Sequence, residues 1–260
     1  MFLTATQAGL AATSGWAVGY SLGLVGGGGS ILAVPMLVYL VGVENPHVAI
    51  GTSAVAVALN AAAGLAMHAR AGTVKWRCAS VFAAAGVAGA LLGSTLGKMI
   101  DGQHLLALFA VLMMVVGGLM LRHRGGEGDS AVRLSRQNLP NLLGLGLAAG
   151  GLSGFFGIGG GFLIVPALML ATRMPIVNAV GSSLVAVTVF GLTTAGNYAW
   201  SGLVDWSIAG LFIAGGVLGS LLGQRSAQWL AGRKAALNTI FSALIIAVAI
   251  YMLVRSLNFV

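Results

Sequence analysis

Two glycine-rich stretches interrupt the two longest apolar segments of the chain. Residues 26–35 read GGGGSILAVP and residues 157–166 read GIGGGFLIVP, so each stretch is followed by a proline at the same spacing. Glycine costs about 1 kcal/mol per position relative to alanine in a helix interior. Irregular backbone at membrane depth is tolerated only where protein buries it or where it lines a water-filled cavity. We therefore expect each stretch to be the unwound tip of a broken helix, and the two tips to form one central site.

The composition is that of a membrane protein. The chain is 58% hydrophobic and 7% charged, whereas a soluble domain is about 25% charged. No basic residue precedes the first apolar segment, so we do not expect a cleaved signal peptide. The formal net charge is +8, but the basic residues fall in loops, which indicates a topology signal and contact with anionic lipid headgroups of the bilayer rather than nucleic acid binding. A single cysteine excludes an internal disulfide.

Eight apolar segments are present, and six of them have the length of one transmembrane helix. These six are residues 47–69, 78–97, 104–121, 177–200, 206–230 and 237–255. The other two, 8–43 and 139–172, are long enough for two short helices that meet at the glycine-rich stretch. A polar linker, 122–138, separates residues 1–121 from residues 139–260. The predicted fold class is an all-α polytopic membrane protein.

The two halves of the chain are alike in sequence. With an offset of 131, the glycines at 15, 19, 23, 26, 28 and 29 and the proline at 35 match the same residue types at 146, 150, 154, 157, 159, 160 and 166. After a shift to an offset of 130, AIGTS at 49–53 matches AVGSS at 179–183, and GTVKW at 72–76 matches GLVDW at 202–206. An ordered series of matches predicts an internal duplication.

The distribution of charge predicts that the two repeats have inverted topology. If each long segment is a re-entrant hairpin, the basic residues share one side of the membrane except for Lys98 and Arg255. If each long segment crosses once, the basic residues divide almost evenly. The basic side is expected to be cytoplasmic. If both long segments are hairpins, we therefore predict that both termini lie in the periplasm and that the protein lies in a bacterial inner membrane. Each repeat is then a re-entrant helical hairpin plus three transmembrane helices, an odd number that inverts the second repeat.

An enzyme is not expected from this set of polar residues. The five acidic residues all fall at or near loops, and no paired carboxylate, metal-ligand cluster or nucleophile–base set lies within the apolar segments. We therefore predict neither a catalytic site, nor a metal, nor a cofactor.

The sequence has more of the features of an anion-binding site than of a catalytic site. A broken helix presents free N–H groups and a positive dipole end at the start of its second half. Glycine also lets an oxyanion approach the backbone closely, and transporters built from inverted repeats hold their substrate near the midplane. The predicted binding residues at the tips are Gly26, Gly27, Gly28, Gly29, Ser30, Gly157, Gly159, Gly160 and Gly161. The alternative is that these glycines only allow the hairpins to pack tightly.

Hydroxyl and amide side chains complete the predicted site. Thr52, Ser53, Ser182 and Ser183 occupy equivalent places in the two halves, and hydroxyls can donate to an oxyanion without burying a charge. Such side chains in helices also bond to their own backbone. Asn60 is a further candidate; like Asn197, it is expected either to bind the ligand or to bond between helices.

Small residues recur every four positions in two further segments. Gly89, Gly93 and Gly97 form one row, and the glycines at 215, 219 and 223 form another. Such rows let transmembrane helices approach closely, so we interpret them as packing faces.

These motifs together resemble the TauE/SafE family of sulfite exporters. The resemblance rests on GGGGSILAVPML, GIGGGFLIVPAL, GTS at 51–53, GSS at 181–183 and the GTVKW and GLVDW junctions, and it covers nearly the whole chain. It implies transport of sulfite or of a small organosulfur anion such as sulfoacetate across the inner membrane.

Three functions are consistent with the sequence. The first is a secondary transporter that binds a small oxyanion between the hairpin tips and moves it by alternating access. The second is an anion channel that uses the same tips as a filter. The third is a membrane enzyme or assembly factor of sulfur metabolism, against which the missing acid–base constellation argues. No oligomeric state is predicted.

Overall fold

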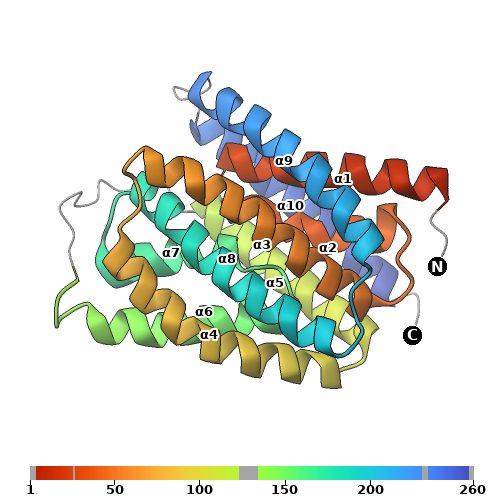
Figure 1. Cartoon of the computed structure of the whole chain (residues 1–260), viewed down its shortest axis with the longest axis horizontal. Helices are drawn as coiled ribbons and strands as arrows, with labels where there is room; N and C mark the ends of the chain where they lie inside the picture. The colour runs from red at the N-terminus through yellow and green to blue at the C-terminus, as the bar shows by residue number, and fades with distance from the viewer. Residues whose placement is uncertain (1–3, 26, 123–133, 230–233, 258–260) are drawn as a thin grey trace.

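The computed structural model describes residues 4–25, 27–122, 134–229 and 234–257, and these residues form a helical bundle without strands (Figure 1). The first half contains α1 (Ala5–Val25), η1 (Gly27–Leu32), α2 (Ala33–Pro35), η2 (Met36–Leu40), α3 (Pro46–Arg70), α4 (Trp76–Met99) and α5 (Gly102–Arg122). The second half contains α6 (Leu139–Phe156), α7 (Gly161–Thr172), α8 (Ile176–Trp200), α9 (Trp206–Trp229) and α10 (Lys234–Leu257). The predicted all-α class is confirmed. Most of the predicted linker, residues 123–133, lies outside the described residues.

Six described helices are long and apolar enough to cross a membrane, namely α3, α4, α5, α6, α8 and α9. Five of these six helices coincide with predicted spans. We expected α6 to be half of a hairpin, yet its 18 residues reach membrane-spanning length. The segment expected at 237–255 lies within α10, which contains the apolar stretch Ser242–Ser256.

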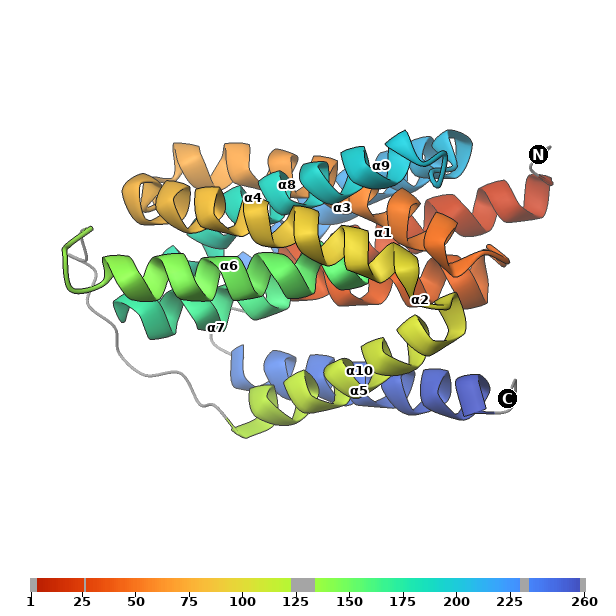
Figure 2. The same cartoon turned by 90° about the horizontal axis from the view of Figure 1, so that it is seen from below.

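Both long apolar segments are broken and reverse direction. α1 starts at one end of the bundle, and the return arm formed by η1, α2 and η2 comes back to that end, where α3 begins (Figure 1). α6 starts at the opposite end, and α7 returns to it (Figures 1 and 2). The two arms are unequal, because α1 has 21 residues and α6 has 18, whereas α7 has 12. The first arms are thus longer than the short helices we expected.

The first arm of each hairpin packs on a helix of the other half. α6 lies along α4, and α1 lies along α9. The predicted glycine rows form these two seams: Gly89, Gly93 and Gly97 face the main-chain oxygens of Leu147, Gly151 and Phe155, and Gly215, Gly219 and Gly223 face those of Ala12, Trp16 and Tyr20. A Cβ at any of these glycines would overlap that oxygen, which confirms the packing role. Close contact along a whole helix explains why α1 and α6 stay regular up to the break.

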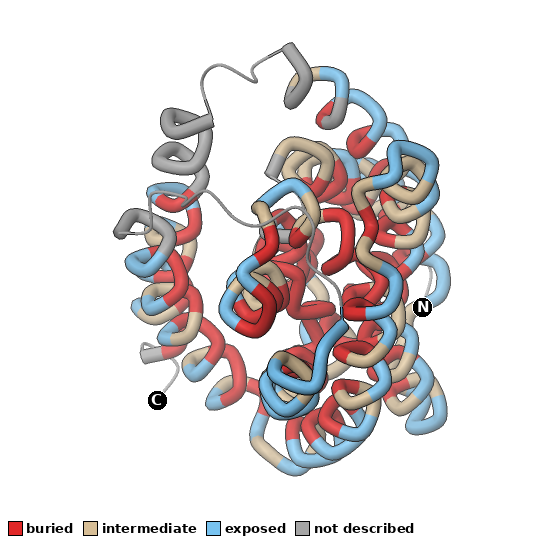
Figure 3. Tube along the Cα trace, turned by 90° about the vertical axis from the view of Figure 1, so that its left-hand side faces the viewer, coloured by how far each residue is buried: buried red, intermediate tan, exposed pale blue. Residues whose placement is uncertain are grey.

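The helices α3 and α8 pack against each other at the centre, and α5 pairs with α10 on one side of the bundle (Figure 2). Buried residues face inward and exposed residues face outward along the helices (Figure 3). The outward residues include many large apolar side chains, such as Leu92, Leu96 and Leu218. An extended apolar exterior of this kind fits contact with lipid. The α3–α8 pair, enclosed on several sides, is where the hairpin tips arrive.

Candidate functional site

The tip of the second hairpin is a short left-handed turn that is buried in the protein. Gly157, Gly159 and Gly160 have φ values of +65°, +63° and +65°, which residues with a Cβ adopt only with strain. Residues 157–161 are all buried. The glycines are therefore required by the backbone conformation of the tip, and they add no side chain of their own beside its amides.

The N-terminus of α7 opens directly from this turn. Its N-cap, Gly160, has no side chain to cap the helix, and the Gly160 carbonyl accepts bonds from the N–H groups of Leu163 and Ile164 at 2.8 and 3.0 Å. Within the described part of the chain, no backbone acceptor is found for the N–H groups of residues 159–162. A buried helix start with unpaired donors is an anion-binding arrangement.

The tip of the first hairpin is only partly described, because Gly26 lies outside the described residues. Gly27 and Gly28 open the 3-10 turn η1, and Gly29 and Ser30 in the same turn are buried. Gly29 lies so close to Leu22 of α1 that a Cβ would overlap the Leu22 nitrogen. The turn η1 contacts both α7 and α8, so the two hairpins touch inside the bundle.

The second tip is wedged between α3, α8 and α6. Gly159 lies between Val57 of α3 and Val187 of α8. Ser53 of α3 donates to the Gly157 carbonyl at 3.2 Å and to Ile50 O at 2.9 Å. These contacts bring one predicted hydroxyl, Ser53, to the tip.

Ser153 is a tip residue that sequence reasoning missed. It belongs to α6 and lies against Gly160, and its hydroxyl is buried without a hydrogen-bond partner. The matching position in the first half is Leu22. Comparison of the two halves therefore could not identify Ser153 as a candidate binding residue.

Thr52 and Ser182 are engaged away from the tips. The Thr52 hydroxyl accepts a bond from the Asp205 N–H, and the Ser182 hydroxyl accepts one from the Lys75 N–H, both at 2.9 Å. Both residues are fully buried. The equivalent hydroxyls thus anchor the loops that precede α9 and α4. Ser183 donates to Val180 O of its own helix at 2.8 Å, the backbone bonding that was the alternative in the sequence.

Asn60 is fully buried, and neither atom of its amide has a hydrogen-bond partner. Its side chain lies against Gly216 of α9. In the second half, Phe190 lies in the same way against Gly86 of α4. At equivalent positions of the two halves, the first half therefore has an amide without hydrogen bonds and the second half has an aromatic ring.

Asn197, in contrast, makes the interhelical bonds that we considered for it. Its amide donates to Ser94 Oγ and Thr95 Oγ1 of α4 at 2.6 and 3.0 Å. Lys98 Nζ donates to Asn197 Oδ1 and to Ser201 Oγ, both at 2.8 Å. From the sequence, Lys98 was considered only as a charge on one side of the membrane. In the structure it hydrogen-bonds α4 to α8 and to the residue that follows α8.

Comparison with known proteins identifies the family. Residues 11–252 match the family model described as "Sulfite exporter TauE/SafE". The chain belongs to the TauE/SafE family. A "Probable membrane transporter protein" from Xylella fastidiosa is 54% identical to this TauE/SafE protein over 248 residues, 94% of each chain. The "Probable membrane transporter protein YunE" from Bacillus subtilis is 28% identical over 221 residues, 77% of this chain and 81% of that one.

No solved structure matches this TauE/SafE protein. The family assignment and the six membrane-capable helices together make it a multi-pass membrane transporter.

Proposed function

We propose that this protein is a secondary transporter that exports sulfite or a related small organosulfur anion. The observation that carries the proposal is the buried start of α7, where the N–H groups of residues 159–162 have no backbone acceptor within the described residues. The family description supplies the substrate class. Oriented amides at a helix start favour a negative solute, and glycine puts no Cβ between those amides and an oxyanion.

Binding at the tips would use neutral donors. The donors at the second tip would be the backbone amides and the Ser153 hydroxyl, and the other predicted partners are the tip residues Gly26 to Ser30 and Asn60. The Ser53 and Ser183 hydroxyls would take part only after releasing the carbonyls to which they now donate. No lysine or arginine lies in the central part of any predicted span. A neutral site holds an anion weakly enough to release it, as transport requires.

Alternating access follows from the arrangement of the hairpins. Each hairpin enters from one end of the bundle, and the tips touch between them (Figure 1). Movement of one hairpin would expose the bound anion to one end while the other hairpin keeps the opposite end closed. As part of the proposal, the repeats are inverted in a bacterial inner membrane, the basic loops face the cytoplasm, and both termini face the periplasm. Thr52 and Ser182 would then anchor the loops that precede α9 and α4, the two helices along which α1 and α6 lie.

The test is flux in proteoliposomes loaded in turn with labelled sulfite, sulfate, thiosulfate and sulfoacetate, with and without a pH gradient. We expect saturable flux of a sulfur anion, and we expect Gly159→Leu to abolish it because a side chain would fill the tip between Val57 and Val187. Gly144→Leu is the matched control, because a Cβ at Gly144 meets nothing within 4 Å.

Normal flux through Gly159→Leu would remove the tip from the binding site. Flux that does not saturate would favour the channel. The buried tips support the transporter over an open channel, because a filter that is continuously open would be hydrated.

A further inference from the structure

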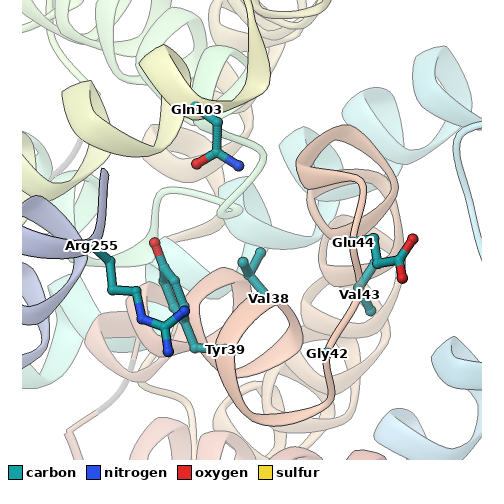
Figure 4. Close-up of a pocket in the computed structure, with 7 residues that line it drawn as sticks. All are labelled: Val38, Tyr39, Gly42, Val43, Glu44, Gln103 and Arg255. Carbon is teal, nitrogen blue, oxygen red and sulfur yellow. The ribbon is translucent and has the colours of Figure 1, made fainter. Parts of the chain in front are cut away.

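A cavity with both apolar and polar lining residues lies away from the tips, at the end of the bundle where α10 finishes. Its volume is about 290 Å³, and it is lined by Val38, Tyr39, Gly42, Val43, Glu44, Gln103 and Arg255 (Figure 4). Three elements that are distant in the sequence supply these residues: the end of the first return arm, the first turn of α5 and the last turn of α10. None of the predicted binding residues belongs to it. We call it the end pocket.

Arg255 supplies the positive charge of the end pocket. Its guanidinium lies over the Tyr251 ring at 5.9 Å from the centroid, and that ring meets the Tyr39 ring edge-on at 5.4 Å. Within the described ranges, no hydrogen bond or ion pair to the Arg255 side chain is found. Stacking on an aromatic ring orients a guanidinium without using its N–H groups, which remain able to bind an oxyanion.

Two neutral donors accompany the guanidinium. The Tyr39 hydroxyl points toward the Gln103 side chain and the Arg255 guanidinium lies beside the Tyr39 ring, whereas the Glu44 carboxylate points away from all three (Figure 4). The position of Gln103 is set by its own backbone, because its N–H donates to the Asp101 carboxylate at 2.9 Å and its carbonyl accepts from Ser256 Oγ at 3.2 Å. α5 and α10 are therefore tied together beside the pocket.

Two other charged groups at this end of the bundle already have partners. The backbone N–H groups of His104 and Gln103 hold the pKa of Asp101 below its ordinary value, so its carboxylate is satisfied by the start of α5. Lys98, the other basic residue predicted for this side, directs its ammonium to Asn197 and Ser201. Arg255 is thus the basic group that remains to meet an anion at this end of the described structure.

We propose that the end pocket binds a small oxyanion through Arg255, Gln103 and Tyr39, and serves as an outer station for the transported anion. The outer-station role rests on the proposed function; binding of an oxyanion does not. A sulfur oxyanion and the phosphate of a lipid headgroup share the required chemistry, namely three or more acceptor oxygens around a negative centre.

The test separates the end pocket from the tips by using the Gly159→Leu protein. Sulfite binding is measured by titration calorimetry on purified full-length protein in detergent. We expect Gly159→Leu to retain a sulfite site, and the added Arg255→Ala to weaken that site at least about tenfold, as expected for loss of a charge-assisted hydrogen bond. Arg70→Ala removes the same charge from the exposed end of α3 and should leave the affinity unchanged.

A second arm tests the sign of the electrostatic effect and the source of the oxyanion. Glu44→Gln should tighten sulfite binding about twofold, because it removes a negative charge from the rim. In lipid nanodiscs, a lipid occupant would appear as thermal stabilisation by phosphatidylglycerol, relative to phosphatidylcholine alone, that Arg255→Ala removes. Either occupant supports the oxyanion site, but a lipid headgroup as the only occupant would overturn the role as an outer station for the transported anion.

The proposal is overturned if Arg255→Ala changes neither sulfite affinity nor the phosphatidylglycerol effect. It is also overturned if Gly159→Leu binds no sulfite and shows no phosphatidylglycerol effect, an outcome that leaves the tip site standing. Normal transport by Gly159→Leu would contradict the tip site and leave the end pocket standing.

Discussion

At the scale of single residues, the two asparagines Asn60 and Asn197 of the central helices show opposite environments. Asn197 is bonded to Ser94, Thr95 and Lys98, whereas the amide of Asn60 has no partner. Burial of an unbonded polar group is costly, and replacement by an apolar group of similar shape can be stabilising. An amide kept at such a cost is expected to bind something in another step of the transport cycle.

We therefore predict that Asn60→Leu raises the free energy of unfolding by about 1–3 kcal/mol and lowers sulfite flux. The matched change Asn197→Leu should lower stability, because it removes the side-chain hydrogen bonds that Asn197 makes with Ser94, Thr95 and Lys98. Thermal melting in detergent and flux in proteoliposomes measure the two effects. An Asn60→Leu protein that is more stable and transports normally would show that the amide has no part in transport.

At the scale of helices, the fold depends on the two seams between α1 and α9 and between α4 and α6. Both seams join residues from different halves of the chain, and both rely on glycines that face a main-chain oxygen. In lipid, such close packing supplies much of the force that holds helices together. A seam of this kind tolerates little added volume.

We predict that Gly219→Ala destabilises the protein by about 1–3 kcal/mol, as overpacking does in other well-packed cores. The reason is that its new methyl group would overlap the Trp16 oxygen. Gly210→Ala lies on the same helix in open space and should be neutral or slightly stabilising. The melting temperatures of the two variants, measured in the same detergent, test this prediction. Equal melting temperatures would mean that α1 can shift away from α9 without loss of stability.

At the scale of the whole molecule, the orientation of the two repeats in the bilayer is the prediction with the widest consequences. Ala71 and Ser201 are equivalent residues at an offset of 130, and both are exposed in loops. The one natural cysteine, Cys78, is buried. Single cysteines at the two loops can therefore report the two sides of the membrane without a change of charge.

We predict that, in a Cys78→Ala background, Ser201→Cys reacts with a membrane-impermeant maleimide in intact cells. Ala71→Cys should react only after the membrane is permeabilised. Labelling is read as a mass shift of the purified protein. Reaction of both cysteines from the same side would show parallel repeats and would remove the basis for alternating access between inverted hairpins.

Much of this architecture could be predicted from local sequence. The predicted segments agree with α3, α4, α5, α8 and α9 to within a few residues, because the length and hydropathy of a span are local properties. The break at Gly157 was predictable because consecutive glycines penalise a helix wherever they occur. The packing role of Gly89 and Gly219 followed from their spacing alone.

Other features depended on contacts between residues about 100 or more positions apart. The sequence presented Thr52 and Ser53 as an equal pair, but the fold turns one toward the Asp205 loop and the other toward Gly157. It offered no reason to group Arg255 with Gln103 and Tyr39, which meet only when α10 packs beside α5 and the first return arm. Composition and periodicity determined the helical membrane class, the breaks and the duplication, since these are properties of neighbouring residues. The tertiary structure decided which polar groups are satisfied and which are left for a ligand, because that depends on what each side chain meets across the bundle.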